Sequence, residues 1–305
     1  MVYVEKVLVG GKEYYRLVHT LRKGSKVIHK RKYIGSILPS KAKLSELTKE
    51  LITEITKGKY KYLSQKDVEE INKIKNTYNK SIRRLSLAEK ENYLKEFAIR
   101  FTYDSSKLSG VDITLRQTSL ILKDGVIPAD VKTLKTVKVL ENHEKGVLVI
   151  TSYKGKLNLN FIKKLHKLLL SGIDDSIAGK TRTELKRNVK LAGTSYVPPS
   201  WNEIKKELNN FFKWFASEQR KLHPLELAAL VHLKIISMQP FVDGNSRLSR
   251  LLMNWILWKK NYPPIDIPIE DLENYYSVLD SYQIEKKENL FVNYIKDRFF
   301  KSTTL

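Results

Sequence analysis

Residues 238–250 read Met-Gln-Pro-Phe-Val-Asp-Gly-Asn-Ser-Arg-Leu-Ser-Arg, and this stretch guides the interpretation of the whole chain. It follows residues 224–236, which are almost entirely apolar and therefore predict a buried helix. A Gly-Asn-Ser turn at the start of the next helix leaves backbone N–H groups without partners, and the positive end of the helix dipole lies beside them. The stretch therefore predicts an anion site at a helix N-terminus.

Three charged side chains narrow the kind of anion. Arg247 and Arg250 are three positions apart, so they share one face of the helix, and guanidinium groups bind phosphate in a bidentate manner. Asp243 would repel a bare phosphate, but a carboxylate and phosphate oxygens can share a Mg²⁺ ion. The set therefore favours a magnesium-bound nucleotide over a simple anion. The alternative is an ordinary helix cap followed by two surface arginines. It explains the acid, the turn and the arginines when each is taken singly, but not their occurrence together in this order behind a buried helix.

The stretch resembles the signature of the Fic (Fido) family of nucleotidyltransferases, His-x-Phe-x-Asp/Glu-Gly-Asn-Gly-Arg-x-x-Arg. The similarity extends over about residues 95–300, with Glu141-Asn-His143 upstream and residues 179–199 in the place of the family's β-hairpin flap. The resemblance implies transfer of AMP from ATP to a target hydroxyl, with ATP and Mg²⁺ as cofactors. It assigns the metal to Asp243, the anion hole to Gly244, Asn245 and Ser246, and the phosphates to Arg247 and Arg250.

Two positions depart from the family pattern. Gln239 stands where the family has its general-base histidine, and a neutral amide cannot accept a proton near pH 7. Ser109 stands at the glutamate position of the inhibitory frame, here Ser105-Ser-Lys-Leu-Ser109-Gly110, whose glutamate blocks the second arginine in the family. We therefore expect a protein that binds Mg-nucleotide but transfers AMP poorly. A substitution introduced at position 239 is the alternative to natural drift, and the parallel loss at position 109 favours drift.

An active nucleotidyltransferase with a non-standard base is a second hypothesis, since it shares all of these residues. The sequence names no substitute base. Four histidines on helices or helix starts are expected to be structural: His143, His166, His223 and His232. Asp112 lies near the inhibitory frame, but nothing in the sequence brings it to the site.

Residues 1–36 differ from the rest of the chain. Their β-type runs are separated by turn signals at Gly10-Gly11 and Gly24-Ser25, which predicts a small antiparallel meander. Aromatic residues are interleaved with basic ones from Tyr14 to Gly35, a pattern that suits single-stranded nucleic acid or a phosphate backbone. The segment also weakly resembles the hairpin that begins some transposases. A nucleic-acid-binding protein is therefore the third hypothesis. The competing explanation is a solvated sheet whose lysines prevent edge-to-edge pairing.

Composition sets outer bounds on the function. The 305 residues carry 56 Lys and Arg against 33 Asp and Glu, a net charge of +23 that attracts polyanions or reflects a basic proteome. The absence of cysteine excludes disulfides, cysteine zinc sites and thiol catalysis. No apolar run approaches the roughly 18–20 residues that span a bilayer, and the N-terminus lacks a signal-peptide core. We therefore expect a cytoplasmic protein with no membrane partner.

The expected fold is mainly α, a Fic-type helical core with a small β-hairpin flap, preceded by the β meander. The expected domains are a basic β module at 1–36, linking helices at 37–94 and a Fic-like domain at 95–300. Helices are expected at 40–57, 65–82, 86–101, 128–152, 158–171, 200–215, 224–237, 245–260, 269–282 and 286–300, with a hairpin at 189–197. The flap carries Lys180, Arg182, Lys186, Arg187 and Lys190, which suggests an acidic target protein.

Overall fold

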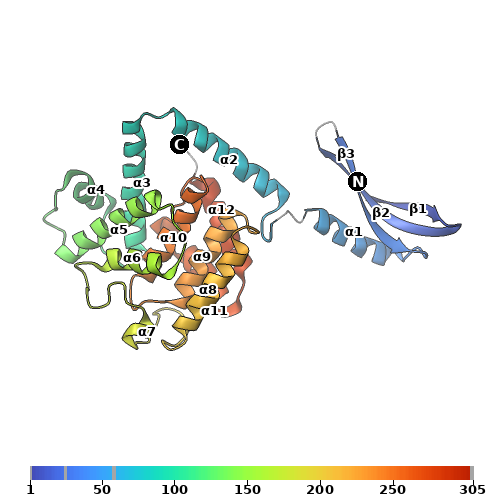
Figure 1. Cartoon of the computed structure of the whole chain (residues 1–305). Coiled ribbons are helices and arrows are strands. Elements are labelled where there is room, and N and C mark those ends of the chain that lie inside the picture. Colours follow the sequence, from blue (N-terminus) through green and yellow to red (C-terminus); the bar gives the residue numbers. More distant parts are fainter. Residues whose placement is uncertain (1, 24–25, 57–59, 303–305) are drawn as a thin grey trace. The chain divides into compact units, whose positions relative to one another are not determined.

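The computed structural model describes residues 2–23, 26–56 and 60–302. The chain divides into two compact units, Met1–Glu69 and Glu70–Leu305, and the division falls in the segment predicted to link the domains. Figure 1 shows that the second unit is built of helices, whereas strands are drawn only in the first. The prediction of a mainly α protein with a short N-terminal β meander is confirmed.

The first unit is a three-stranded antiparallel sheet with one helix. Its strands β1 (Val2–Val9), β2 (Lys12–Lys23) and β3 (Lys26–Gly35) pair in sequence order. Gly10 and Gly11 join β1 to β2 with φ values of 59° and 78°, and a two-residue hairpin turn of this kind needs positive φ at both positions. The predicted turn at Gly24-Ser25 lies outside the described residues. Helix α1 (Lys41–Thr56) packs against β2.

The second unit holds the remaining helices. They are α2 (Gln65–Arg84), α3 (Leu87–Lys107), α4 (Leu115–Asp124), α5 (Leu134–Ser152), α6 (Leu159–Leu170), α7 (Arg182–Leu185), α8 (Ile204–Glu218), α9 (Pro224–Met238), α10 (Asn245–Lys259), η1 (Ile269–Asp271), α11 (Leu272–Glu285) and α12 (Glu288–Lys301). The first turn of α2 belongs to the first unit. Two of these helices, α9 and α10, are buried along nearly their whole length and pack on each other.

The other helices enclose this central pair. Helices α3, α5 and α6 pack on α10, whereas α8, α11 and α12 pack on α9. The short segment between α9 and α10 is the motif of residues 238–250, so it is held from both sides by the core. This arrangement gives the motif loop a rigid base.

Three sequence predictions about these elements are wrong in detail. Helix α5 begins at Leu134, because Thr133 caps it with its side chain while Pro128 lies in the preceding loop. Helix α4 was missed, although Thr114 and Gln117 form a capping box at its start. No strand forms at residues 189–197, where the chain is an extended loop with a turn at Gly193.

The flap is a loop because its polar groups bond to the core. Tyr196 donates from its hydroxyl to the Ser237 carbonyl at 3.0 Å, and Thr194 donates to the Asp280 carboxylate at 2.8 Å. Two prolines, at 198 and 199, lack the N–H groups that a strand ladder needs. The flap is therefore fixed to α9 and α11 by side chains.

Within the described parts of the chain, no helix is long and apolar enough to cross a membrane. The same residues contain no group of three or more His, Asp or Glu side chains that could hold a metal ion unaided.

Candidate functional site

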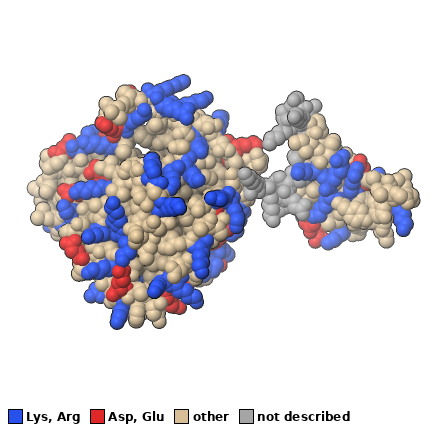
Figure 2. All heavy atoms as spheres, in the orientation of Figure 1, with Lys and Arg blue, Asp and Glu red and all other residues tan. Residues whose placement is uncertain are grey.

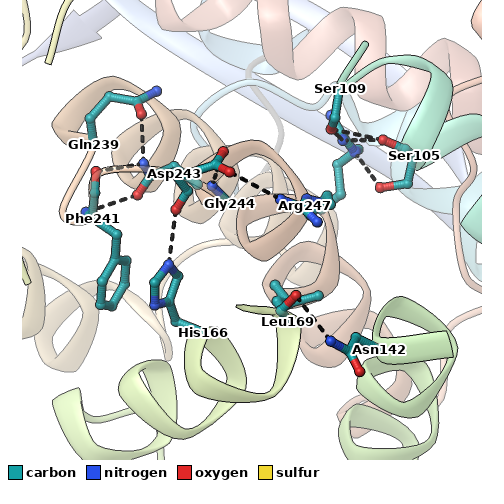
Figure 3. A network of polar contacts seen from close by, with 12 residues as sticks. Ser105, Ser109, Asn142, His166, Leu169, Gln239, Phe241, Asp243, Gly244 and Arg247 are labelled. Carbon is teal, nitrogen blue, oxygen red and sulfur yellow. Dashed lines mark hydrogen bonds and ion pairs between the residues drawn. The ribbon is translucent and has the colours of Figure 1, made fainter. Parts of the chain in front are cut away.

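Helix α9 ends at Gln239, whose backbone is left-handed (φ 49°, ψ 61°) and turns the chain into the motif loop. Its carboxamide is bonded at both ends: Nε2 donates to the Ile236 carbonyl at 2.7 Å, and Oε1 accepts from Asn245 Nδ2 at 2.7 Å. Figure 3 shows the bond at the Gln239 oxygen. The residue is only 7% exposed. The position where the resemblance places a general base therefore holds a neutral side chain whose two polar groups are already bonded.

Asn245 closes the motif loop from the other side. Its Oδ1 accepts from the Phe241 N–H at 3.0 Å, and its Nδ2 donates to the Phe241 carbonyl at 2.8 Å as well as to Gln239. The side chain is 2% exposed. Asn245 was predicted to line the anion hole, but its side chain is used inside the loop, so only its backbone is left for a ligand.

Gly244 stands immediately before α10 and explains why the helix start is open. It is left-handed (φ 76°), and no side chain caps the helix there. A Cβ at this position would lie 2.8 Å from Leu170 Cδ2, and the positive φ also disfavours a side chain, so glycine suits this close packing on α6. The first N–H groups of α10 are consequently left without a cap, as the anion-site prediction requires.

Arg247 and Arg250 both extend from α10 into the protein rather than into solvent, with exposures of 5% and 1%. Arg247 Nη2 lies 3.6 Å from Asp243 Oδ2, and burial lowers the pKa of Arg247. Each guanidinium keeps one buried Nη1 that has no hydrogen-bond partner among the described residues. Two buried cations with unused donors beside an uncapped helix start are the groups that an anion-binding site requires.

Arg250 is held by the end of α3. Its Nε donates to Ser105 Oγ at 2.9 Å, and its Nη2 donates to the Ser105 carbonyl at 2.7 Å and to Ser109 Oγ at 2.8 Å. Figure 3 shows Ser105 and Ser109 side by side at these contacts. The structure thus brings the inhibitory frame to the second arginine, as the resemblance implies, but with neutral oxygens in place of a carboxylate.

A hollow of about 410 Å³ lies in front of these groups. It is lined on the motif side by Asp243, Gly244, Ser246 and Arg247, and on the other sides by Ser109, Gly110, Tyr276 and flap residues 189–191. Asp243 presents its side chain here at 65% exposure, while its Oδ1 accepts from the Gly244 N–H at 2.5 Å. An exposed carboxylate beside phosphate-binding groups suits Mg²⁺, which binds through one or two carboxylates, substrate phosphates and water.

A second hollow of about 450 Å³ continues from the first. The two share Leu191, Gln239, Ser246 and Tyr276, and the second extends between the flap and α11. Together they form a groove that runs beneath the flap from the α10 N-terminus.

Three of the four histidines that were predicted to be structural are buried and hydrogen-bonded inside the protein. His143 bonds Thr102 at 2.9 Å, His232 bonds the Tyr275 hydroxyl at 3.1 Å, and His223 accepts from the Leu225 N–H at the start of α9. Burial lowers the pKa of His143 and His232 well below the usual value. Asp112 pairs with Lys132 on the surface at 2.7 Å and does not line the groove.

His166, on α6, lies under the motif loop. Its Nε2 donates to the Asp243 carbonyl at 2.9 Å, a bond that Figure 3 shows. Its Nδ1 accepts from the Gly179 N–H at 2.9 Å, and its ring stacks on Phe241. It thereby joins the start of the flap to the motif. The sequence indicated a structural histidine here but not this connection.

Arg182 is the functional residue that the sequence interpretation misplaced. It was grouped with the basic residues of the flap surface, yet its side chain is fully buried. Nε donates to the Gln239 carbonyl at 2.6 Å, and Nη2 donates to the carbonyls of Pro199 and Met238 at 2.7 and 3.1 Å. It therefore fixes both flap ends to the C-terminus of α9, where a cation is favoured by the helix dipole. Its place directly after the Gly179 turn was the available signal.

Comparison with known proteins agrees with this geometry. Residues 156–257 match the model of the Fic/DOC family. The chain carries a Fic domain.

Relatives of this Fic domain include the protein adenylyltransferase Fic of Drosophila mojavensis, 33% identical over 191 residues, which are 61% of this chain and 36% of the relative. The protein adenylyltransferase Fic of Nematostella vectensis is 31% identical, with coverage of 61% and 44%. The chain therefore spans less than half the length of these relatives.

A Fic-domain signalling protein of Bacteroides thetaiotaomicron has a similar solved structure, with a TM-score of 0.67 and 29% identity over 77% of this chain and 94% of that one. Fic-1 of C. elegans shares the fold, with a TM-score of 0.67 and 22% identity over 87% of this chain and 76% of that one.

Proposed function

We propose that this Fic domain binds Mg-ATP at the start of α10 and transfers AMP to a protein hydroxyl only slowly. One observation supports nucleotide binding most directly. Arg247 and Arg250 are both buried, and each keeps an Nη1 donor without a partner next to the uncapped helix start. A polyphosphate would supply acceptors to both guanidinium groups and to the backbone N–H groups of residues 245 and 246, whereas the Gly244 N–H already donates to Asp243. The relatives named as adenylyltransferases support ATP as the nucleotide.

Asp243 is the residue that would hold Mg²⁺ in this proposal. Its carboxylate is exposed in the hollow beside the phosphate-binding groups, where it could hold the ion, and the ion's charge would offset the repulsion between carboxylate and phosphate. When bound, Mg²⁺ neutralises charge on the phosphates. The protein's own contribution is to hold the phosphates through Arg247, Arg250 and the α10 N-terminus.

The second part of the proposal concerns the proton. AMP transfer forms a bond between the target oxygen and the α-phosphorus and breaks the bond to pyrophosphate, and the hydroxyl proton needs an acceptor. Gln239 cannot take it, because a carboxamide is not basic and its Oε1 already accepts from Asn245. General-base catalysis is typically worth about 10²–10⁴-fold in rate, so transfer should be slower by that order.

Ser109 bears on how readily the site takes a nucleotide. Its hydroxyl is an acceptor for Arg250, but it is neutral and lies on an exposed residue. A γ-phosphate could replace it at small cost, whereas a carboxylate would hold the arginine by a charge-assisted bond. In this proposal the nucleotide site is therefore free of inhibition.

The target would lie along the groove beneath the flap. Lys190 is exposed and lines this groove, and Lys186 and Arg187 are exposed nearby in the sequence, so an acidic protein is the proposed partner. Arg182 does not contribute to this surface, because its side chain is buried and bonds the carbonyls of Met238, Gln239 and Pro199.

Ser246→Asp tests nucleotide binding with little risk to folding. Ser246 is the second residue of α10 and lines both hollows. Aspartate is favourable in the first helical turn but would repel phosphate. We expect calorimetry to give ATP binding at least about 10-fold weaker in Ser246→Asp than in the neutral, similarly sized control Ser246→Asn. Equal ATP affinity in the two variants would contradict the assignment of the phosphate site.

Gln239→His tests catalysis. With ATP labelled in its α-phosphate and an acidic protein mixture as acceptor, we expect Gln239→His to retain about 10²–10⁴-fold more label on protein than the unaltered chain. Strong labelling by the unaltered chain would instead support the hypothesis of an active enzyme with a non-standard base.

A further inference from the structure

The sheet of the first unit has two unlike faces. Residues directly opposite each other in an antiparallel pair share a face. Leu17 is opposite Val4 and Lys32, and Lys32 Nζ bonds Glu50 of α1 at 2.9 Å, so this face lies toward α1. The register places Arg16 and Val18 on the other face with their strand partners. We call this other face the tyrosine face, and its members include Tyr3, Tyr14, Arg16, His29, Arg31 and Tyr33.

Aromatic rings on the tyrosine face are paired and exposed. The rings of Tyr14 and Tyr33 lie 5.9 Å apart, and Tyr33 and Tyr3 are 64% and 43% exposed. Beside them is a hollow of about 300 Å³, which Val7, Val9 and Arg16 also line. Folding does not require exposed tyrosines, and rings presented in this way offer flat surfaces on which a planar group can stack.

The charge of this unit is concentrated. Residues 1–69 contain 16 Lys and Arg against 7 Asp and Glu, a net charge of +9 (16 − 7); the other 236 residues contain 40 against 26, a net charge of +14 (40 − 26). The net positive charge per residue is therefore about twice as high in the first unit. Figure 2 shows Lys and Arg atoms gathered on it. On the tyrosine face Arg31 is exposed and forms no ion pair with any described residue.

We propose that the tyrosine face binds single-stranded nucleic acid. Bases would stack on Tyr33 and Tyr14, while Arg31 and the surrounding positive charge would contact the phosphates. Single strands fit better than a duplex, because their bases are free to lie on exposed rings. An acidic protein or an anionic membrane would use the charge but gives no role to the paired rings.

Two adjacent residues of β3 provide a matched test of the phosphate contact. Lys30 and Arg31 are both exposed and form no ion pair with the part of the chain that the structure describes. Lys30 lies opposite His19 on the α1 face, whereas Arg31 lies opposite Val18 on the tyrosine face. With the full chain and a fluorescent oligothymidylate, we expect Arg31→Ala to weaken binding and to reduce the slope of log K against log salt by about 0.7, the share of one phosphate in a single strand. Lys30→Ala also removes one positive charge, but it should change the affinity and the salt slope less.

Stacking is tested with Tyr33→Leu, a change at an exposed position. Loss of one stacked base corresponds to about 5- to 150-fold weaker binding. We expect that loss for oligothymidylate and none for an abasic strand of equal length, which has the phosphates but no bases. Equal effects of Arg31→Ala and Lys30→Ala, or equal effects of Tyr33→Leu on both strands, would overturn the proposal. So would binding to phosphatidylserine vesicles without binding to oligothymidylate.

Discussion

At the residue scale, His166 links the motif loop to the start of the flap. Its neutral ring donates to the Asp243 carbonyl and accepts from the Gly179 N–H, so protonation would put a second N–H against Gly179. Burial lowers the pKa of His166 to about 4, although the bond to Asp243 acts in the opposite direction. The folded protein therefore favours the neutral form.

This residue gives a pH-dependent prediction. A folded-state pKa of about 4, against 6.5 for an ordinary histidine, means that the neutral ring stabilises the fold above pH 6.5 and that this contribution is lost as pH falls toward 4. We expect His166→Gln, whose amide does not titrate, to be less stable than the unaltered chain at pH 7, with a difference that shrinks by as much as about 3 kcal/mol at pH 4. Urea unfolding at both pH values measures it. A difference that stays constant with pH would show that His166 is not buried in its neutral form.

At the element scale, the C-terminus of α3 sets access to Arg250. At this helix end, the Arg250 guanidinium donates to the hydroxyl and carbonyl oxygens of Ser105 and to the hydroxyl of Ser109. Of these two serines, Ser109 lines the hollow. A carboxylate at position 109 would make a charge-assisted bond worth roughly 1.5–3 kcal/mol, which a phosphate would have to displace. We expect Ser109→Glu to weaken ATP binding by about 10-fold or more in calorimetry.

Two variants at the same position separate charge from size. Ser109→Gln adds a side chain as long as glutamate without its charge, and Ser109→Ala removes the hydroxyl. Both should bind ATP nearly as well as the unaltered chain. If glutamine is as harmful as glutamate, then obstruction of the hollow rather than an ion pair with Arg250 is the cause.

At the scale of the whole molecule, the two units have separate cores. The buried apolar residues of the first unit are Leu17, Val18, Leu51 and Leu63, whereas the second is centred on α9 and α10. Since no residue of the groove belongs to the first unit, we expect a fragment of residues 60–305 to bind ATP with unchanged affinity. The same fragment should lose oligothymidylate binding. Loss of ATP binding in a fragment that still melts cooperatively would show that the first unit contributes to the nucleotide site.

Helices that carry their own local signals could be predicted from the sequence. The Ser86–Glu89 capping box and the cap at Asn158 start α3 and α6 where expected, and Pro224 opens α9. Proline at 128 was taken for a helix start because it suits a first turn, but Thr133 supplies the cap instead. The flap was predicted as a hairpin because its strand-like residues do not reveal that Tyr196 and Thr194 bond to α9 and α11.

The sequence by itself determined which residues could bind a phosphate and which could not act as a base, because these are properties of guanidinium, carboxylate and carboxamide groups wherever they lie. It also determined the positive charge of the first unit and the left-handed turn that Gly244 permits. Only the tertiary structure decided which partners these groups have. It turned Asn245 and Arg182 inward, put Ser109 on Arg250 and placed Tyr14, Arg31 and Tyr33 on one face, since contacts between residues far apart in the chain depend on how helices and strands pack.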